Sequence, residues 1–396
     1  MVSPKTDTEQ IRRENRRLLV ETLRHQGPLA RVELGAITSL SPATVTAITS
    51  ELVAQGHLQE LSSSEEPSGR GRPRVALSLV ADSAHYIGIK ISINEIRLML
   101  GNYAGEVTKQ FSVQLNTSAL SPQQLVHELS GEVQRFIDKH HLQMAELKGI
   151  GLAVQGVVDQ QHGGILWSPA FRQAQPGLAE ALSQRFNLPA LIANDADCLA
   201  LALHTQPRYR DTKDMIAIQL GYGVGMGLIQ NGQLYLGSRG AIAEFGHTKV
   251  SLDGPLCRCG ARGCLEAYLG DYALLRDASA FVTLPPGDPM HPSEEQMQYI
   301  QKQASLGNEN ILHIYQQAGR MLGLGLSNLM ALYNPEKIVI SGPGVRAAPL
   351  SQDPIQEALQ ESLLPYLRDT DCIETHHWNE DLTGKGIIAM LQKMSD

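Results

Sequence analysis

The sequence lacks a long apolar run. No segment reaches the roughly eighteen consecutive apolar residues that a transmembrane helix requires. The charged start, residues 1–17, has no apolar core, so we expect no signal peptide there. Aromatic residues make up only 5% of the chain, whereas apolar residues together reach 42%, as in an ordinary soluble protein. We therefore expect a cytoplasmic protein, and its 396 residues are enough for two or three domains.

The chain also lacks an excess of basic residues. Its formal net charge of −8 argues against a nonspecific nucleic-acid binder. The charge is unevenly spread, because residues 1–80 carry ten Lys and Arg against nine Asp and Glu, whereas the remaining residues carry 23 against 32. A near-neutral amino-terminal segment with clustered arginines, followed by an acidic body, is compatible with local contact to DNA.

Cysteine is scarce, and three of the five cysteines lie close together. Cys257, Cys259 and Cys264 fall within eight positions, and His247 lies ten residues before the first of them. Thiols at such spacing cannot bridge each other without strain, and a Cys₃His set suits a closed tetrahedral Zn²⁺ site. Four protein ligands leave no open position, so we expect the zinc to be structural. The alternative is a loop of buried free cysteines.

The first eighty residues carry the pattern of a helix-turn-helix. Apolar spacing predicts a helix over residues 8–26, which Gly27-Pro28 ends. A short helix over 31–37 and a turn come next. Ser41-Pro42 is then typical of the N-cap and first residue of a third helix, over 42–55. Two short helices separated by a tight turn, the second of them capped, are typical of DNA-binding proteins.

The third predicted helix has two different faces. Its apolar side, which should pack inward, consists of Val45, Ile48, Thr49 and Leu52. Its opposite side carries small residues with methyl and hydroxyl groups, namely Ala43, Thr46, Ala47 and Ser50. Such a face can lie close in a major groove and contact thymine methyls or base edges. The alternative is the solvated side of a helical bundle.

A basic segment and a predicted strand follow. Residues 68–74 read SGRGRPR, and residues 75–80 alternate as a strand does, which predicts a β-hairpin wing with arginines at its tip. Arg70 and Arg72 would enter an A·T-rich minor groove, where the potential is most negative. A flexible basic linker is the alternative. Together the two patterns predict a winged helix-turn-helix DNA-binding domain over residues 1–80.

From residue 81 onward, strand and helix patterns alternate, which predicts an α/β body. The expected elements include strands at 86–91, 95–102, 147–154, 215–220, 225–230 and 337–341, and helices at 121–140, 171–185 and 311–332. Two similar halves, each with a glycine-rich loop, predict a bilobal fold with a ligand cleft between the lobes. We expect the first lobe at 81–194, completed by a C-terminal helix at 385–396, and the second at 195–384.

Four motifs of this body resemble a known family. They are Asn194-Asp195-Ala196, Gly221-Tyr-Gly-Val-Gly-Met-Gly227, Glu244-Phe-Gly-His247 and Cys257-x-Cys259-Gly-x-x-Gly-Cys264-x-Glu266. They resemble the motifs of the ROK family (repressors, open reading frames and sugar kinases), which has an actin/hexokinase-like fold. With a winged module in front, the chain is similar to sugar-responsive repressors of the Mlc/NagC type. The resemblance also implies that the Cys₃His set is a structural zinc site.

The resemblance implies a hexose site in the cleft beside this cysteine motif. The matching positions are Asn194, Asp195, Glu244, His247 and Glu266. Carboxylates and an amide supply the acceptors and donors that sugar hydroxyls need, and His247 would use one ring nitrogen for zinc and the other for sugar. In the family's kinases the carboxylate matching Asp195 is the general base. Taken singly, the glutamates would only hold the loop, and Asn194-Asp195 would be a turn at a strand end.

The resemblance also indicates that the phosphate-binding elements of the kinases are altered. Lys90 replaces the acidic residue of their Asp-x-Gly-Gly-Thr motif, and Ser92 and Ile93 replace its glycines. Tyr222 stands where the kinases usually have threonine, and Pro343 removes a backbone donor from a third element. We therefore expect a sugar sensor without catalytic residues. An active sugar kinase with a DNA-binding appendage is the competing hypothesis.

A repressor of this kind should be a homodimer or a higher homo-oligomer. A twofold-symmetric protein grips both half-sites of a palindromic operator, which we expect to be A·T-rich. Two signals are open: a sugar or sugar phosphate in the cleft, or sequestration by a glucose permease of the phosphotransferase system, as the resemblance to Mlc-type members implies. A further alternative is an adaptor that mainly binds such a permease.

Overall fold

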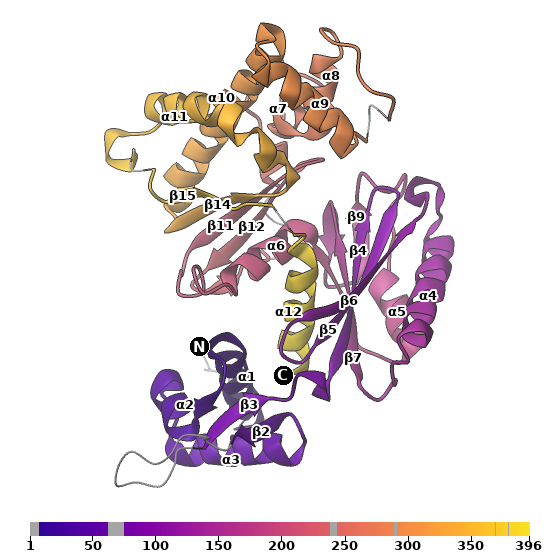
Figure 1. Cartoon of the computed structure of the whole chain (residues 1–396), viewed down its shortest axis with the longest axis vertical. Coiled ribbons are helices and arrows are strands. Elements are labelled where there is room, and N and C mark those ends of the chain that lie inside the picture. Colours follow the sequence, from indigo (N-terminus) through magenta and orange to yellow (C-terminus); the bar gives the residue numbers. More distant parts are fainter. Residues whose placement is uncertain (1–7, 62–74, 238–243, 289–290, 369, 379) are drawn as a thin grey trace, which may run out of the picture.

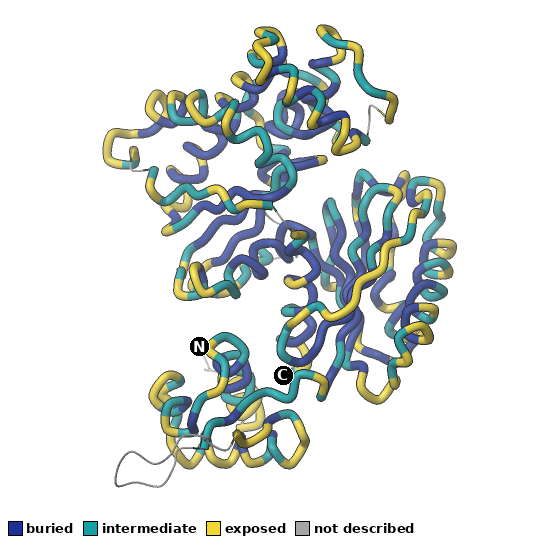
Figure 2. Tube along the Cα trace, viewed as in Figure 1, coloured by how far each residue is buried: buried dark blue, intermediate teal, exposed yellow. Residues whose placement is uncertain are grey.

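The computed structural model describes residues 8–61, 75–237, 244–288, 291–368, 370–378 and 380–396. Figure 1 shows an amino-terminal module at one end of the molecule and a body with two larger sheets. Two helices, α6 (Asp195–His204) and α12 (Thr383–Ser395), lie between the sheets. Buried residues concentrate on the strands of both sheets and on these two helices (Figure 2).

The amino-terminal module consists of three helices and a small antiparallel sheet. The helices are α1 (Thr8–Gln26), α2 (Arg31–Thr38) and α3 (Pro42–Ala54), and the sheet has the order β1-β3-β2, with β1 (Leu29–Ala30), β2 (Leu58–Leu61) and β3 (Ala76–Leu79). The Ser41 hydroxyl accepts a hydrogen bond from the Thr44 backbone N–H, and Pro42 begins α3, as the sequence predicts. The expected strand at 75–80 is β3, which pairs with β2; residues 62–74, which join the two, lie outside the described part of the chain.

The first sheet of the body has the strand order β10-β7-β4-β5-β6. Its strands are β4 (His85–Ser92), β5 (Glu95–Asn102), β6 (Val107–Gln114), β7 (Leu147–Val154) and β10 (Ala190–Asn194), with a small hairpin of β8 (Val157–Asp159) and β9 (Gly164–Trp167) beside it. One face packs on α4 (Pro122–Lys139) and α5 (Leu178–Phe186). The other face packs on α12, which approaches so closely that a Cβ at Gly101 would lie 2.4 Å from Ile388. Helices on both faces explain why β4 and β7 are buried almost throughout.

The second sheet has the order β13-β12-β11-β14-β15. Its strands are β11 (Met215–Leu220), β12 (Val224–Gln230), β13 (Gln233–Leu234), β14 (Lys337–Ser341) and β15 (Ile373–Thr375). Helices α10 (Glu309–Tyr333) and α11 (Ala348–Ser362) cover one face, and α6 covers the other. Three further helices, α7 (Glu266–Leu269), α8 (Asp271–Ala278) and α9 (Glu294–Ser305), extend this half. Among the described residues, no helix is both long and apolar enough to cross a membrane.

The helix predicted over 171–185 is wrong in its first half. The structure begins α5 only at Leu178, and the backbone of Gln175 instead exchanges hydrogen bonds with Ile165 on β9. Pro176 disfavours helical geometry at the residue before it, and Gly177 takes a left-handed conformation at the N-cap, with φ of 63°. Apolar periodicity therefore overestimated this helix, because it does not register the two residues that interrupt the chain.

The module and the body share one apolar cluster. Leu19, Val20 and Leu23 of α1 belong to the same cluster as Ile388 and Leu391 of α12. At its edge the Arg24 guanidinium pairs with the Asp396 carboxylate at 3.1 Å, with side chains only 9% and 1% exposed. The Arg24 Nε also donates to the Tyr103 carbonyl, which lies at the end of the β4–β5 layer. The module is thus fastened to the carboxyl-terminal end of α12.

Candidate functional site

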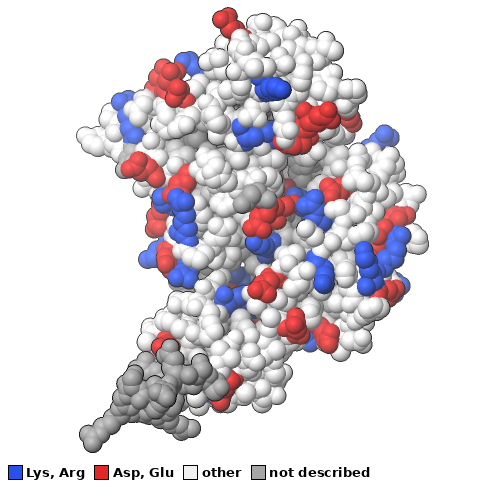
Figure 3. All heavy atoms as spheres, viewed as in Figure 1, with Lys and Arg blue, Asp and Glu red and all other residues white. Residues whose placement is uncertain are grey.

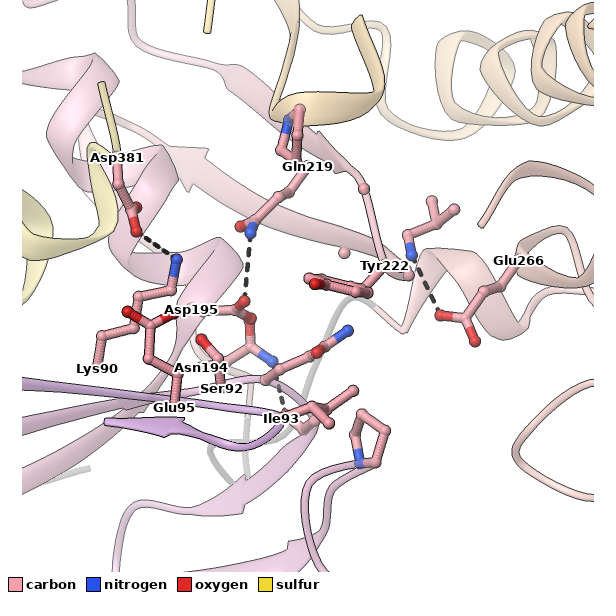
Figure 4. Close-up of a pocket in the computed structure, with 18 of the residues that line it drawn as sticks. Lys90, Ser92, Ile93, Glu95, Asn194, Asp195, Gln219, Tyr222, Glu266 and Asp381 are labelled. Atoms are coloured by element: carbon pink, nitrogen blue, oxygen red, sulfur yellow. Dashed lines mark hydrogen bonds and ion pairs between the residues drawn. The ribbon is translucent and has the colours of Figure 1, made fainter. Parts of the chain in front are cut away.

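A cleft of about 270 Å³ opens where the ends of the two sheets face each other. One wall comes from β4 and β5, and the opposite wall comes from residues 221–225, which are the turn after β11 and the first two residues of β12. Figure 4 shows Lys90 and Asp381 on one side of the cleft, Asn194, Asp195 and Gln219 near its centre, and Glu266 on the far side. Residues that are far apart in the sequence are brought together here because strand ends and helix starts meet between the lobes.

All five residues predicted to touch a sugar line this cleft. They are Asn194, Asp195, Glu244, His247 and Glu266. They come from three places: the junction of β10 with α6, the short turn Phe245–His247 with the residue before it, and the start of α7. The structure therefore gathers side chains that lie as far apart in the sequence as Asn194 and Glu266.

Asn194 and Asp195 stand at the amino-terminal end of α6. The Asn194 side chain caps this helix by accepting a hydrogen bond from the Ala196 backbone N–H at 2.7 Å, and it donates to the Gly156 carbonyl at 2.6 Å. Asp195 is buried and accepts a hydrogen bond from Gln219 at 3.2 Å. Burial raises the pKa of Asp195, although the nearby Lys90 opposes this shift. The strand-end turn that we considered as an alternative is therefore present, at a place where the same side chains also face the cleft.

Asp197, two residues after Asp195 in α6, is a buried carboxyl group close to the cleft. Burial, followed by the charges of Asp195 and Glu244, raises its pKa to about 8. One of its oxygens has no hydrogen-bond partner among the described residues. The start of α6 thus holds two neighbouring acids whose environment favours the protonated form.

Glu266 and Glu244 differ in their surroundings. Glu266 is buried, and one carboxylate oxygen accepts a hydrogen bond from the Val224 backbone N–H at 3.1 Å. A Cβ at Gly223 would lie 2.5 Å from that oxygen, so a side chain at this position of the glycine loop (residues 221–227) would displace the Glu266 carboxylate. Glu244 is 40% exposed, and its carboxylate lies 3.8 Å from the His247 Nε2. One glutamate is therefore fixed in the wall of the cleft, and the other stands at its mouth.

A candidate metal centre adjoins the cleft. The Sγ atoms of Cys257, Cys259 and Cys264 and a ring nitrogen of His247 all lie within 4.8 Å of one another. The Cys259–Cys264 Sγ separation is 3.7 Å, and the Cys257 Sγ lies 3.6 Å from the His247 Nδ1. Tetrahedral zinc with Zn–S distances of about 2.3 Å would place two sulfurs about 3.8 Å apart, so the donor set fits a metal ion of this kind.

The surroundings of the cysteines also suit thiolates. The Lys249 ammonium donates to the Cys264 Sγ at 2.8 Å, and the Tyr272 hydroxyl donates to the Cys257 Sγ at 3.6 Å. Arg258, between two of the cysteines, donates to the Tyr222 carbonyl of the glycine loop and lies 3.9 Å from the Tyr272 ring centroid. These contacts fasten the loop of residues 257–264, the cysteine loop, to the wall of the cleft.

Several residues of the cleft escaped the sequence analysis. Gln219, Trp167, Trp378 and Asp381 line it, yet none belongs to a motif that we recognised. The sequence shows only that Lys90 replaces an acidic residue of the kinase motif. In the structure the Lys90 Nζ pairs with Asp381 at 2.5 Å. The scarcity of tryptophan is a sequence feature that could have pointed to these two residues: the chain has only two, and both line the cleft. No pattern linked Asp381 to Lys90, since 291 positions separate them.

The four α3 residues predicted to read DNA form a separate exposed face. Ala43, Thr46, Ala47 and Ser50 are exposed, whereas Val45, Ile48, Thr49 and Leu52 are buried. The other two predicted contacts, Arg70 and Arg72, lie outside the described residues. On the face of the molecule in Figure 3, the described acidic and basic side chains of the body are interspersed. A candidate nucleic-acid surface therefore belongs to α3 rather than to a broad basic patch on this side of the body.

Comparison with known proteins places the body and suggests relatives for the whole chain. The chain is 28% identical over 342 residues to the DNA-binding transcriptional dual regulator NagC of Escherichia coli K12. The aligned region covers 86% of this chain and 83% of NagC. It is 26% identical to the DNA-binding transcriptional repressor Mlc of the same organism, covering 98% of this chain and 95% of Mlc. It is 25% identical to the xylose repressor of Bacillus subtilis, with 86% and 85% covered.

Solved structures share the fold. A ROK family transcriptional regulator described as a homologue of the Escherichia coli Mlc protein superposes with a TM-score of 0.82 and 24% identity, covering 97% of each chain. A ROK family glucokinase from Streptomyces griseus, solved with glucose and AMPPNP, has a TM-score of 0.64 at 24% identity and covers 78% of this chain and 99% of its own. The model of the ROK family matches residues 86–393, which include both sheets, the cleft and the cysteine loop. This chain belongs to the ROK family.

Proposed function

We propose that this protein is a DNA-binding transcriptional repressor of genes for sugar uptake or metabolism, whose body binds a sugar in the cleft. The observation that carries the proposal is the exposed α3 face of small residues, on a module that shares its core with a ROK body. Relatives named as NagC, Mlc and xylose repressors support it. In this reading residues 1–80 are the DNA-binding domain, residues 81–194 with 385–396 form one lobe, and residues 195–384 form the other.

The module acts as a winged helix-turn-helix. Helix α3 enters the major groove, where Ala43, Thr46, Ala47 and Ser50 contact base edges and thymine methyls. The β2–β3 hairpin is the wing, and Arg70 and Arg72 near its tip enter the minor groove. A homodimer or higher homo-oligomer presents two such modules to a palindromic, A·T-rich operator.

The body acts as the sensor. Hydroxyl groups of a sugar donate to the carboxylates of Asp195, Glu244 and Glu266, and the Asn194 amide and the His247 Nε2 complete the polar set. Zn²⁺ is held by His247, Cys257, Cys259 and Cys264 and plays a structural part, because all four ligands come from the protein. By fixing the cysteine loop, it keeps His247 and Glu266 in place around the ligand.

Phosphoryl transfer does not suit this cleft. It depends on metal ions and backbone donors that neutralise phosphate charge, whereas Lys90 with its partner Asp381 occupies the wall where an acidic residue would hold Mg²⁺. A coupled ADP-release assay with glucose, N-acetylglucosamine and N-acetylmannosamine should show no turnover. Turnover with any of them would favour the alternative, an active sugar kinase with a DNA-binding appendage.

Regulation acts through the geometry of the module relative to the body. A sugar that closes the cleft moves the lobes and thereby changes the spacing of the two α3 helices in the oligomer. Sequestration by a phosphotransferase-system glucose permease is a second route, which the similarity to Mlc supports. A permease acting alone would leave operator binding insensitive to free sugars. A gel-shift assay with and without sugars therefore distinguishes the two routes.

A gel-shift assay tests the proposal. The purified protein is titrated against A·T-rich palindromes from sugar-uptake genes at one stated salt concentration, because salt sets protein–DNA affinity. We expect specific binding that Ala47→Glu abolishes, since it places a carboxylate against the groove. Ala145→Glu, which adds the same charge on an exposed part of the body, serves as the control and should bind normally. Equal binding by both variants would contradict the assignment of α3.

Metal analysis tests the zinc site separately. Wild-type protein should contain about one zinc per chain, and Cys257→Ser should lose it together with sugar binding. Cys372→Ser, which lies outside the cysteine loop, should retain both. Wild-type protein purified without zinc and stable to a chelator would overturn this part of the proposal.

A further inference from the structure

The β4–β5 wall of the cleft is closed by a chain of ion pairs. The Lys90 Nζ lies 2.5 Å from one Asp381 oxygen, and the Arg97 guanidinium lies 3.5 Å from the same oxygen. Arg97 also pairs with Glu95 at 3.1 Å. Lys90 and Arg97 are the only Lys and Arg among the described residues that line the cleft, and carboxylates of the protein pair with both of them. Figure 4 shows the Lys90–Asp381 pair.

Asp381 is itself firmly held. Its second oxygen accepts a hydrogen bond from the Thr383 backbone N–H at 3.1 Å, at the first turn of α12. Burial by itself would raise the pKa of Asp381, but Lys90 and the hydrogen bonds from Lys90 and Thr383 lower it, so the group is a carboxylate. A ligand that drew Lys90 away would leave this partly buried negative charge without its main partner.

Three backbone donors in or beside the cleft wall are also in use. The Val224 N–H donates to Glu266, and the Gly221 N–H donates to the Gly223 carbonyl, within the glycine loop. In the β4–β5 turn the Asn94 N–H donates to the Thr117 hydroxyl. An incoming phosphate would need such N–H groups to replace its hydration, and these three already have acceptors.

The charge balance of the lining points the same way. Five carboxyl groups line the cleft, from Glu95, Asp195, Glu244, Glu266 and Asp381, against the two cations and His247. Burial raises the pKa values of Asp195 and Glu244, and the two cations are already paired with Asp381 and Glu95. A phosphate ester carries a charge of about −1.5 to −2 at neutral pH and would find no unpaired Lys or Arg among these lining residues. The hydroxyl groups of an uncharged sugar, in contrast, are hydrogen-bond donors, which is what an acceptor-rich cleft requires.

We propose that the cleft selects a sugar without a phosphate group, and that the Lys90–Asp381 pair excludes the phosphorylated form. This inference rests on the proposed sugar-binding function and narrows its ligand class to neutral sugars. It has a consequence for the signal, because phosphorylation of the sugar inside the cell would convert a bound ligand into one that the repressor rejects.

Tryptophan fluorescence offers a direct test, since both tryptophans of the chain, Trp167 and Trp378, line the cleft. The zinc-loaded full chain is titrated with glucose, N-acetylglucosamine and xylose, and with glucose 6-phosphate and N-acetylglucosamine 6-phosphate, at constant ionic strength. Calorimetry repeats each titration as an independent readout. We expect a free hexose to bind at least about tenfold more tightly than its own 6-phosphate, a ratio within the range that one unfavourable pocket contact produces.

The variant Asp381→Asn should lower the ratio of the affinity for the free hexose to the affinity for its 6-phosphate. It removes the carboxylate that holds Lys90, so the ammonium becomes available to phosphate, and the sugar phosphate should gain about tenfold relative to the free sugar. Asp211→Asn is the matched control, because this aspartate is 93% exposed and lies outside the cleft lining. If Asp381→Asn fails to fold, Lys90→Met serves instead: it leaves the Asp381 carboxylate without its cation, so the preference for the free sugar should increase, and a preference that falls would remove the role given to the pair.

The outcomes separate this inference from the proposed function. If wild-type protein binds a hexose phosphate as tightly as the free hexose or more tightly, the inference is overturned, whereas the sugar cleft stands. If neither form of any sugar gives a fluorescence change or heat, the sugar-binding function itself is overturned, and the inference with it. An unchanged ratio in a folded Asp381→Asn variant would remove the role given to the Lys90–Asp381 pair.

Discussion

An aspartate lies at each end of α12 and pairs with a basic side chain, but the two pairs differ in their exposure to solvent. Just before its amino-terminal end, Asp381 pairs with Lys90 at the wall of a cleft, with side chains 17% and 15% exposed. At its carboxyl-terminal end, Asp396 pairs with Arg24 in the apolar cluster between body and module, with side chains 1% and 9% exposed. A ligand can reach the first pair, whereas the second is sealed. The comparison teaches that an aspartate–cation pair becomes a recognition element or a clamp according to its access to solvent.

The middle of α12 connects these ends rigidly. Gly386 lies against α6 so closely that a Cβ there would fall 1.8 Å from the Cys198 carbonyl oxygen. Helix α6 in turn begins with Asn194 and Asp195 in the cleft. The cleft, α6, α12 and the amino-terminal module thus form a continuous packed path. Because the packing is close, a displacement at one end should be transmitted to the other.

The largest expected effect comes from breaking the middle of α12. Gly386→Val should destabilise the protein by about 3 kcal/mol or more, because a side chain there collides with backbone that cannot move aside. Both sugar binding and operator binding should fall. The control is Gly131→Ala in α4, another helical glycine, where a Cβ meets only the end of Arg135 at 3.8 Å. It should be neutral or stabilising by up to about 1 kcal/mol.

Urea denaturation of both glycine variants measures this difference. If Gly386→Val unfolds at the same urea concentration as wild type, the close packing of α12 on α6 is not what the protein adopts in solution.

The next effect distinguishes the two ion pairs. Arg24→Met should lower the free energy of unfolding by about 3 kcal/mol, because it leaves the Asp396 carboxylate buried without a partner. Lys90→Met should cost less, about 1.5 kcal/mol, because its partner keeps contact with Arg97, the Thr383 N–H and some solvent.

The functional losses should divide in the same way. We expect Arg24→Met to weaken operator binding in gel shifts while sugar titrations of the folded protein stay unchanged. Lys90→Met should retain operator binding. Equal losses of operator binding and sugar binding in both variants would show that the Arg24–Asp396 and Lys90–Asp381 pairs do not have different roles.

Stability should depend on pH with opposite signs at the two ends. Near the module, burial and the charge of Arg24 lower the pKa of His25 to about 4, so folding excludes a proton that the unfolded chain binds below the ordinary histidine pKa of 6.5. This part of the stability is present above pH 6.5 and is lost as the pH falls toward 4. Near the cleft, burial raises the pKa of Asp197 from 3.8 to about 8, so its contribution is present below pH 3.8 and is lost as the pH rises toward 8.

Urea denaturation at pH 5, 7 and 8.5 tests both signs. His25→Gln should gain stability relative to wild type mainly at pH 5, and Asp197→Asn mainly at pH 8.5. Each variant is compared with wild type at the same pH, so the titration of other groups cancels to first order. Gains at the same end of the pH range for both variants would show that the two environments do not differ as described.

The smallest expected effect concerns the cap of α3. Ser41→Ala removes the side-chain acceptor for the Thr44 N–H and should cost about 1 kcal/mol, whereas Ser41→Asp should preserve the cap. Thermal unfolding measures the difference. A loss of operator affinity beyond this small destabilisation would indicate that Ser41 itself contacts DNA.

Local rules accounted for much of the fold. Caps and apolar spacing predicted α1 and α3 within one residue of their observed bounds, and the central strands of both sheets within two. The same rules failed where Pro176 and Gly177 interrupt an apolar pattern, and they missed β8, β9 and β15, which are only three or four residues long. Strands so short carry too few residues for alternation to be detected.

The sequence by itself determined the chemistry of two groups of residues: a Cys₃His set at metal-ligand spacing, and a capped helix with an exposed face of small residues. These depend on neighbours within one turn or one loop, and local rules suffice for them. Only the tertiary structure decided what Lys90 and Arg24 do, because their partners Asp381 and Asp396 come from the far end of the chain. Packing of α12 against β4 and α1 creates both pairs, and burial then sets their roles, since the strength and accessibility of a charge depend on the solvent around it.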